Sequence, residues 1–145
     1  MTLFSEATGR PVISTESART VGVIAGFIIG TTSKRIIALR LSKTTVDGDT
    51  LRWDDLTAFG PDAVTVPSEA IIVSAREPAS ELSVEEAEVV GKRLLTDAGA
   101  ELGIVDDVEF DPATGALQHL ITAADRVAGD RLIGCGKYAV IVHAV

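Results

Sequence analysis

Short runs of apolar residues, separated by turn-forming residues, extend along the whole chain. The longest run, VGVIAGFIIG at residues 21–30, is apolar on both alternating faces, which is typical of a buried strand. It is far shorter than the about 20 apolar residues that cross a membrane as a helix. The other runs are rich in Val, Ile and Leu and are bounded by Gly, Pro and Asp. The pattern predicts an all-β protein of many short strands, without membrane insertion.

The apolar pattern occurs twice, which predicts two copies of one structural unit. Residues 9–41 and 91–122 both begin with Gly and a basic residue, then show an apolar pair, a polar turn and the pattern apolar-Gly-apolar-apolar. Each copy continues through a turn, GTTSKR or DPATGA, into spaced apolar positions. Each then has a Gly-Asp pair, at Gly48 and Gly129, followed by apolar residues. The expected unit is strand, turn, strand, hairpin, strand, loop, strand.

The turn residues support an antiparallel arrangement. In DPATG, Asp111 and Pro112 suit the first turn positions and Gly115 suits the last, where a positive φ is favoured. Short antiparallel strands lose their exposed edges when they close into a small barrel. We therefore expect two tandem small antiparallel β-barrels that pack as a pseudo-dimer. The expected boundaries are a first repeat at 1–75, a linker with a short helix at 76–90, and a second repeat at 91–145.

The linker contains the one helical signal. Ser83 and Glu86 fit a capping box, and the apolar residues that follow at spacings of three suit one face of an amphipathic helix. The sequence predicts a short helix at residues 83–90, which ends at a glycine.

Charge and composition narrow the classes of protein. The chain has 145 residues, of which 46% are apolar, and a net charge of -8. An acidic surface disfavours direct contact with nucleic acid or anionic lipid, since both require basic residues. The single cysteine, Cys135, excludes an internal disulfide and a multi-cysteine metal site. A reducing, cytoplasmic location is the simplest expectation.

The stretch at residues 102–121 places four carboxylates within six positions, at Asp106, Asp107, Glu109 and Asp111, with His119 just beyond. In one continuous strand, side chains alternate between faces. Ile104 would then lie on a largely apolar face, and Asp107, Glu109 and Asp111 on a largely acidic one. A calcium loop of the EF-hand type needs a central Gly and a distal Glu, which are missing. We expect a solvated strand, with a weak cation site at the three carboxylates as the alternative.

No arrangement of residues indicates catalysis. His119 and His143 are isolated in sequence, and Cys135 lies in no nucleophile motif. The chain contains no phosphate-binding loop, no G-x-S-x-G elbow and no H-E-x-x-H pair. We therefore expect no enzymatic activity, no cofactor and no catalytic residues.

A set of large apolar residues leaves two interpretations open. Such residues either pack between the two copies or around a barrel end, or they form the surface for a partner protein or a homodimer. The set consists of Ile24, Phe27, Ile29, Trp53 and Phe59.

The segments GRPVISTESARTVGVIAGFIIG, RIIALRL and GDTLRWDDLTAFGPDAVTV of the first copy, and GKRLLTDAGAELGIVDDVEFDPATGALQHL of the second, resemble the PRC-barrel domain. That domain is named for the cytoplasmic part of the photosynthetic reaction centre H subunit. The ending of the second copy departs from the pattern, because a segment matching WDDL is missing and GCG stands there.

The resemblance implies a small, highly bent antiparallel barrel. It implies no shared active site, and its known settings are protein-interaction ones. The resulting expectation is a non-enzymatic adaptor whose partner is another protein. The alternatives are an accessory protein of ribosome maturation or RNA processing, which would contact a basic ribosomal protein, and a small-ligand or metal-binding protein that uses the acidic stretch and His119.

Overall fold

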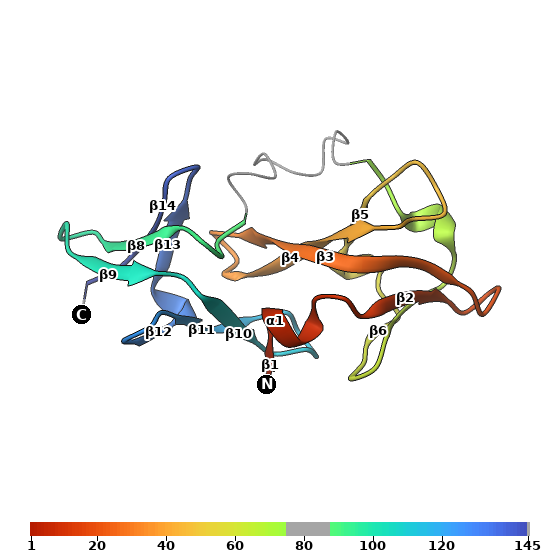
Figure 1. Ribbon diagram of the computed structural model, residues 1–145, viewed down its shortest axis with the longest axis horizontal. Coiled ribbons are helices and arrows are strands. Elements are labelled where there is room, and N and C mark those ends of the chain that lie inside the picture. Colours follow the sequence, from red (N-terminus) through yellow and green to blue (C-terminus); the bar gives the residue numbers. More distant parts are fainter. Residues whose placement is uncertain (75–87, 145) are drawn as a thin grey trace.

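The computed structural model describes residues 1–74 and 88–144 and shows a mostly β protein, as predicted (Figure 1). The strands of the N-terminal part are β1 (Thr2–Leu3), β2 (Pro11–Ser14), β3 (Thr20–Gly30), β4 (Arg35–Ser42), β5 (Thr50–Arg52), β6 (Ala58–Phe59) and β7 (Val64–Val66). Those of the C-terminal part are β8 (Arg93–Thr96), β9 (Glu101–Ile104), β10 (Asp107–Phe110), β11 (Leu117–Ile121), β12 (Arg126–Ala128), β13 (Leu132–Cys135) and β14 (Ala139–Val142). The short helical elements are α1 (Phe4–Ala7) and the 3-10 turns η1 (Trp53–Asp55), η2 (Glu69–Ile71) and η3 (Gly129–Arg131).

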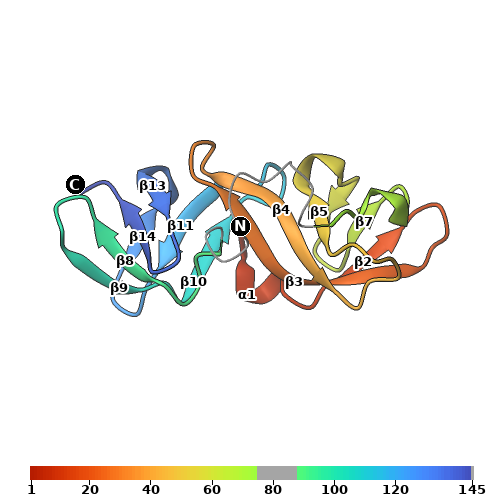
Figure 2. The same ribbon diagram turned by 90° about the horizontal axis from the view of Figure 1, so that it is seen from above.

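The described strands form three sheets. One has the order β5-β4-β3-β2-β7-β6, the second β13-β14-β8-β9, and the third β1-β10-β11-β12. The N-terminal strand β1 therefore joins a sheet of the C-terminal half. Figure 2 shows β2, β5 and β7 towards one end of an elongated molecule and β8, β9 and β14 towards the other, with α1 between them.

The two halves repeat one pattern of pairing. β2 pairs antiparallel with β3 and parallel with β7, and β8 pairs antiparallel with β9 and parallel with β14. Val12 lies opposite Gly22, as Leu94 lies opposite Gly103, and the register shifts immediately after both pairs. The remaining strands correspond as well, because β3-β4-β5 and β10-β11-β12 are both antiparallel meanders. The repeat predicted from the apolar pattern is thus present in the strand registers.

The acidic stretch is not one continuous strand, contrary to prediction. β9 ends at Ile104 and β10 begins at Asp107, so the chain passes from one sheet to another between them. Ile104 is 53% exposed, whereas Val105 is completely buried. The alternation predicted across residues 102–111 is therefore wrong before Asp107 and correct after it. The first repeat bends at the matching place, where the register of β3 shifts between Ile24 and Gly26.

The predicted match between Gly48 and Gly129 is also wrong. Gly48 precedes β5, whereas Gly129 follows β12 and begins η3. The counterpart of Gly129 is Trp53, which begins η1 after β5. The second copy therefore does contain the segment matching WDDL, in the form GDRL, and continues into β13 and β14.

The tips of two hairpins, β3-β4 and β10-β11, join the halves through reciprocal hydrogen bonds. The amide of Ile36 donates to the carbonyl of Gly115 at 2.8 Å, and the amide of Leu117 donates to the carbonyl of Lys34 at 3.1 Å. Ile36 and Leu117 occupy corresponding positions in β4 and β11. Gly115 has a φ of +79°, as the turn sequence predicts, and a Cβ there would lie 3.0 Å from the ring of Trp53. The contact between the copies is therefore close and nearly symmetric.

One contiguous apolar cluster extends through both halves. Phe110 is completely buried in it. Its ring lies 5.6 Å from that of Phe4, 5.7 Å from Phe27, 5.4 Å from Phe59 and 6.4 Å from Trp53, measured between centroids. A side chain of the second repeat thus fills the space between aromatic rings of residues 1–75.

The predicted helix at residues 83–90 falls largely outside the described residues. Its last three positions, 88–90, are described and are not helical. Glu88 and Val89 lead instead into a turn at Gly91, whose φ is +90°. The boundaries expected at 75 and 90 stay predictions.

Candidate functional site

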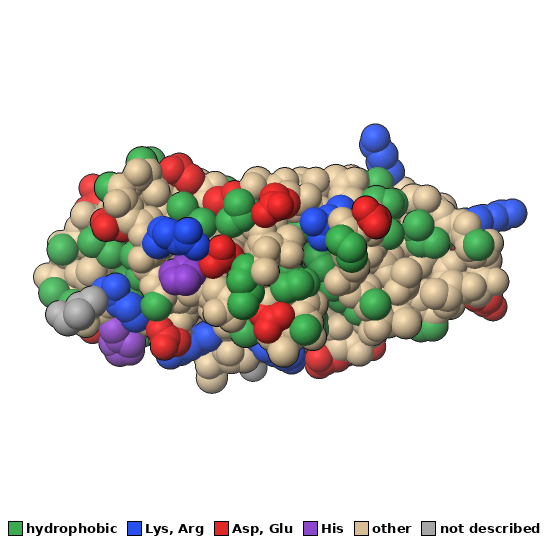
Figure 3. Space-filling model, turned by 90° about the horizontal axis from the view of Figure 1, so that it is seen from below, with side chains coloured by type: hydrophobic (Ala, Val, Ile, Leu, Met, Phe, Trp, Pro, Cys, Tyr) green, Lys and Arg blue, Asp and Glu red, His purple; other side chains and the backbone are tan. Residues whose placement is uncertain are grey.

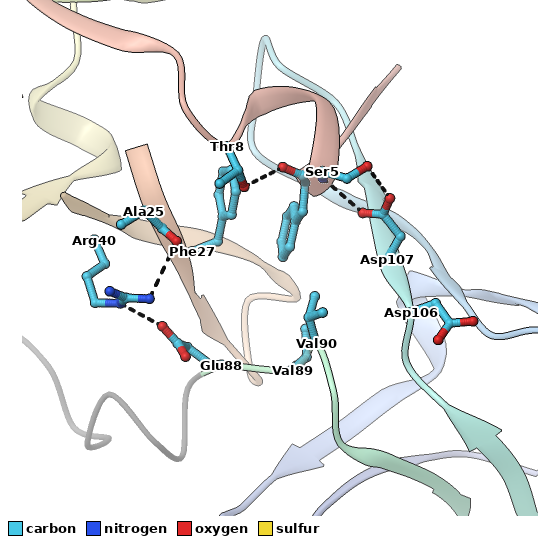
Figure 4. Close-up of a pocket in the computed structure, with 12 residues that line it drawn as sticks. Ser5, Thr8, Ala25, Phe27, Arg40, Glu88, Val89, Val90, Asp106 and Asp107 are labelled. Atoms are coloured by element: carbon cyan, nitrogen blue, oxygen red, sulfur yellow. Dashed lines mark hydrogen bonds and ion pairs between the residues drawn. The ribbon is translucent and has the colours of Figure 1, made fainter. Parts of the chain in front are cut away.

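A pocket of about 310 Å³ opens between the two halves. Its walls come from α1 and the residue after it, from β3 and β4, from residues 88–90, and from the bend before β10 (Figure 4). The lining residues are Phe4, Ser5, Thr8, Ala25, Gly26, Phe27, Arg40, Glu88, Val89, Val90, Asp106 and Asp107. Pockets at junctions between structural units are common binding sites, so this is the candidate functional site.

The floor of the pocket is apolar. The rings of Phe4 and Phe27 stack with centroids 4.0 Å apart and an interplanar angle of 12°. Both side chains are almost fully buried, as is Val89. Phe4 is positioned by α1, where the carboxylate of Glu6 accepts a hydrogen bond from the amide of Leu3. The short helix and strand β3 together present an aromatic surface to the cavity.

An ion pair forms one wall of the pocket. Arg40 Nε donates to Glu88 Oε1 at 2.7 Å, and each side chain is about one-third exposed, at 34% and 35%. A Cβ on Gly26 would lie 2.8 Å from Arg40 Nη2 and 2.9 Å from Glu88 Oε1. A larger residue at this position of β3 would push the charged ends of Arg40 and Glu88 away from the strand. The pair thus links the first repeat to the residues that lead into the second.

The opposite wall is acidic. Asp107 accepts hydrogen bonds from the backbone amide and the hydroxyl of Ser5 and from the amide of Val108. These bonds fasten α1 to the start of β10. Asp106 lies beside it in the lining, and its carboxylate points away from the cavity (Figure 4). Ser5 has a carboxylate partner but no histidine, because both histidines are outside the lining, so the arrangement is not a nucleophile with its base.

The structure places the three predicted metal candidates in separate roles. Asp107 holds α1, Glu109 pairs with His119 and Arg126, and Asp111 accepts a bond from the amide two residues later within its own turn. Among residues 1–74 and 88–144, no three His, Cys, Asp or Glu side chains converge in a way that could hold a metal ion. The carboxylates instead stabilise the local backbone and its neighbouring strands.

Glu109 has a lowered pKa. The hydrogen bond with His119 Nδ1, at 2.9 Å, is the main cause, and the bond from Arg126 Nη2, at 3.0 Å, adds to it. Figure 3 shows both histidines, in purple, in the half of the molecule that holds the C-terminal strands, beside basic and acidic side chains. Glu109, His119 and Arg126 lie on β10, β11 and β12, so their contacts link the three strands.

Replacing Glu109 by Gln should lower stability at neutral pH only. Because the pKa of Glu109 is lower in the folded state, its contribution is present above its ordinary pKa near 4.5 and is lost as the pH falls through the folded value. The loss should be under about 1 kcal/mol, since the partners are partly exposed. Urea unfolding of both proteins from pH 7 to pH 3 should give curves that converge at acid pH. A constant difference across this range would contradict the electrostatic assignment.

The five apolar interface candidates lie in or against the core. Ile24, Phe27, Ile29 and Trp53 are 1%, 4%, 0% and 8% exposed, and Phe59 is half-buried and stacks on Trp53. Phe27, Trp53 and Phe59 each contact Phe110 of the second repeat. The burial of Trp53 leaves it little surface to offer a docked protein. Among the described residues, the exposed large apolar side chains are others: Met1, Val90, Ile104, Ile133 and Tyr138.

His143 and Cys135 stand apart from the pocket. His143 Nδ1 lies 3.4 Å from Asp97, whose pKa is lowered chiefly by a hydrogen bond from the amide of Ala144 and further by His143. Cys135 Sγ lies 3.7 Å from Lys92 Nζ. Neither contact brings a histidine to the cysteine, so the described residues contain no Cys–His pair.

The pocket residues Ser5, Gly26, Arg40 and Glu88 were not foreseen as a site. They are far apart in sequence, and only the fold brings them together. One usable signal was Gly26, because a glycine inside a strand often marks a close approach of other groups.

Comparisons with known proteins identify no relative: no family model matches the chain, and no curated protein matches it. None of the described helices has the length and apolar character required to span a membrane. The site therefore has to be interpreted from its own geometry.

Proposed function

We propose that this chain is a non-enzymatic adaptor of the PRC-barrel type, in which two tandem barrels pack as a pseudo-dimer and bind another protein. The observation that carries the proposal is the repeated strand register together with the reciprocal hydrogen bonds between the hairpin tips. Two copies related in this way form a composite pocket at their junction. The sequence resemblance to PRC-barrel domains supports the same conclusion independently.

The polar side chains at the pocket also favour binding over catalysis. Arg40 is paired with Glu88 and Asp107 with Ser5, so these groups are arranged in structural pairs. We further propose a cytoplasmic location, which agrees with the single cysteine and the acidic composition.

The proposal is tested by affinity purification of the tagged protein from its own cells, followed by mass spectrometry. The expected result is one protein that is reproducibly recovered with the tagged chain and not with the tag alone. Direct binding should then be measured with both purified proteins. Recovery of no protein, combined with turnover in an activity screen, would contradict the adaptor function. Recovery of a ribosomal protein would instead favour the ribosome-maturation alternative.

A further inference from the structure

We infer that the pocket between the repeats receives a lysine or arginine side chain from a basic segment of the partner protein. The inference rests on the adaptor function proposed above and specifies the chemistry of the partner. It is carried by the cavity itself, which combines an aromatic floor with a rim that has the carboxylates of Glu88 and Asp107 and the guanidinium of Arg40. A cavity with this lining is complementary to an aliphatic chain that ends in a positive charge.

The floor suits the aliphatic part of such a side chain. Lys and Arg bury their methylene groups against apolar surface and keep the charged group near water. The stacked rings of Phe4 and Phe27, with Val89, provide this surface. Val90, at the edge, is 49% exposed and offers a contact for an aliphatic neighbour of the basic residue. A volume of about 310 Å³ is at the lower limit of small-molecule sites and fits one long side chain.

The rim suits the charged group. Glu88 uses only Oε1 to bind Arg40, and Oε2 has no hydrogen-bond partner in the part of the chain that the structure describes. Asp107 is bound to Ser5 and Val108, and these donors are neutral. Arg40 therefore offsets one of the two negative charges of the rim. The carboxylate of Asp106 points away from the cavity (Figure 4).

The two repeats differ at this place. Since Gly22 corresponds to Gly103 in the strand registers, Ala25 and Gly26 correspond to Asp106 and Asp107. These matching pairs lie on opposite walls of the pocket (Figure 4). The wall at Ala25 and Gly26 has small, uncharged residues and leaves room for the Arg40–Glu88 ion pair. The wall at Asp107 is acidic. The overall net charge of -8 would attract a basic partner from a distance.

The test uses short peptides as probes. The first is acetyl-Gly-Ser-Val-Lys-Val-Ser-Gly-amide, and two matched peptides replace its lysine by norleucine or by glutamate. Each is titrated into the full-length 15N-labelled protein and followed by amide chemical shifts. The lysine peptide should shift the amides of Gly26, Val90 and Asp106 and bind about fivefold more tightly than the norleucine peptide. The glutamate peptide should bind more weakly than both.

Variants assign the effect to the pocket. Glu88→Gln should weaken binding of the lysine peptide by about threefold, the size expected for a partly exposed charge pair. Asp62→Asn is the matched control, because it removes the same charge at an exposed turn outside the pocket. It should leave binding unchanged.

Equal binding of the lysine and norleucine peptides, or an equal effect of Asp62→Asn and Glu88→Gln, would overturn the inference. So would tighter binding of free pentylamine than of the peptide, since the ligand would then be a small amine. These outcomes do not depend on recovery of a partner from cells. The pocket assignment and the adaptor function can therefore fail separately.

Discussion

Replacing Phe110 by Ala should lower the free energy of unfolding by about 3–5 kcal/mol, the range for a large aromatic side chain removed from a core. Phe110 is completely buried and contacts four aromatic rings of residues 1–75. The cavity left behind would lie at the contact between the repeats, where two sets of strands would have to move to close it. Urea unfolding followed by far-UV circular dichroism measures the loss.

The exposed Tyr138 supplies the control for this substitution. Its side chain is 85% exposed, so Tyr138→Ala should change stability by less than about 0.5 kcal/mol. Because the apolar cluster is contiguous, the unchanged protein should unfold in one transition. A Phe110→Ala protein that loses less than about 1 kcal/mol would contradict the proposed packing between the repeats.

Replacing Gly129 by Ala should cost about 3 kcal/mol, the upper end of the usual cost of overpacking. A Cβ at this position would lie 2.2 Å from the carbonyl oxygen of Leu117 and 2.6 Å from its carbonyl carbon. Backbone atoms cannot turn aside as the end of a side chain can, so η3 would have to move away from β11. The loss should appear as a lower urea midpoint with an unchanged slope.

Gly134→Ala is the matched control for the Gly129 substitution. Nothing lies within 4 Å of a Cβ at Gly134, which belongs to the same half of the molecule. This variant should be as stable as the unchanged protein. If Gly129→Ala were equally harmless, the close packing of η3 on β11 would be wrong.

The two repeats differ at the residue that begins the 3-10 turn. The position that begins η1 holds Trp53 in the first repeat, and its counterpart that begins η3 holds Gly129 in the second. Trp53 extends over the tip of the second repeat's hairpin at Gly115, whereas Gly129 lets η3 pack directly on its own sheet. The repeats therefore contribute unequally to their contact, although the backbone hydrogen bonds there are reciprocal.

Local signals in the sequence account for much of the fold. Alternating and continuous apolar runs predicted the strands, since side chains alternate along β-structure. Repeated spacing predicted the matching of Leu94 with Val12, because each follows the same Gly-basic opening. The positive φ at Gly115 followed from turn chemistry. These features depend on neighbouring residues only, so they can be recognised without knowledge of the fold.

Features that depend on distant residues were not predictable in this way. The break before Asp107 was missed, because the alternation of a strand says nothing about where the chain changes sheets. The addition of β1 to β10 joins residues more than 100 positions apart, and no local pattern marks such pairing. The predicted Gly48–Gly129 correspondence was wrong because it relied on a Gly-Asp dipeptide that occurs at both places. The strand order, which shows the true correspondence, is known only from the strand pairing.

The sequence by itself determined that this protein is built of β-strands, that its strand pattern occurs twice, and where its main turns lie. These properties follow from the periodicity of apolar residues and the backbone preferences of Gly and Pro. The tertiary structure alone decided which residues meet at the junction. These residues come together there because β1 and α1 of the N-terminal segment bind β10, and because an ion pair joins β4 to residue 88; they include Phe4, Arg40, Glu88 and Asp107. A pocket made from five separate segments has no periodicity, since each segment contributes only one to three residues.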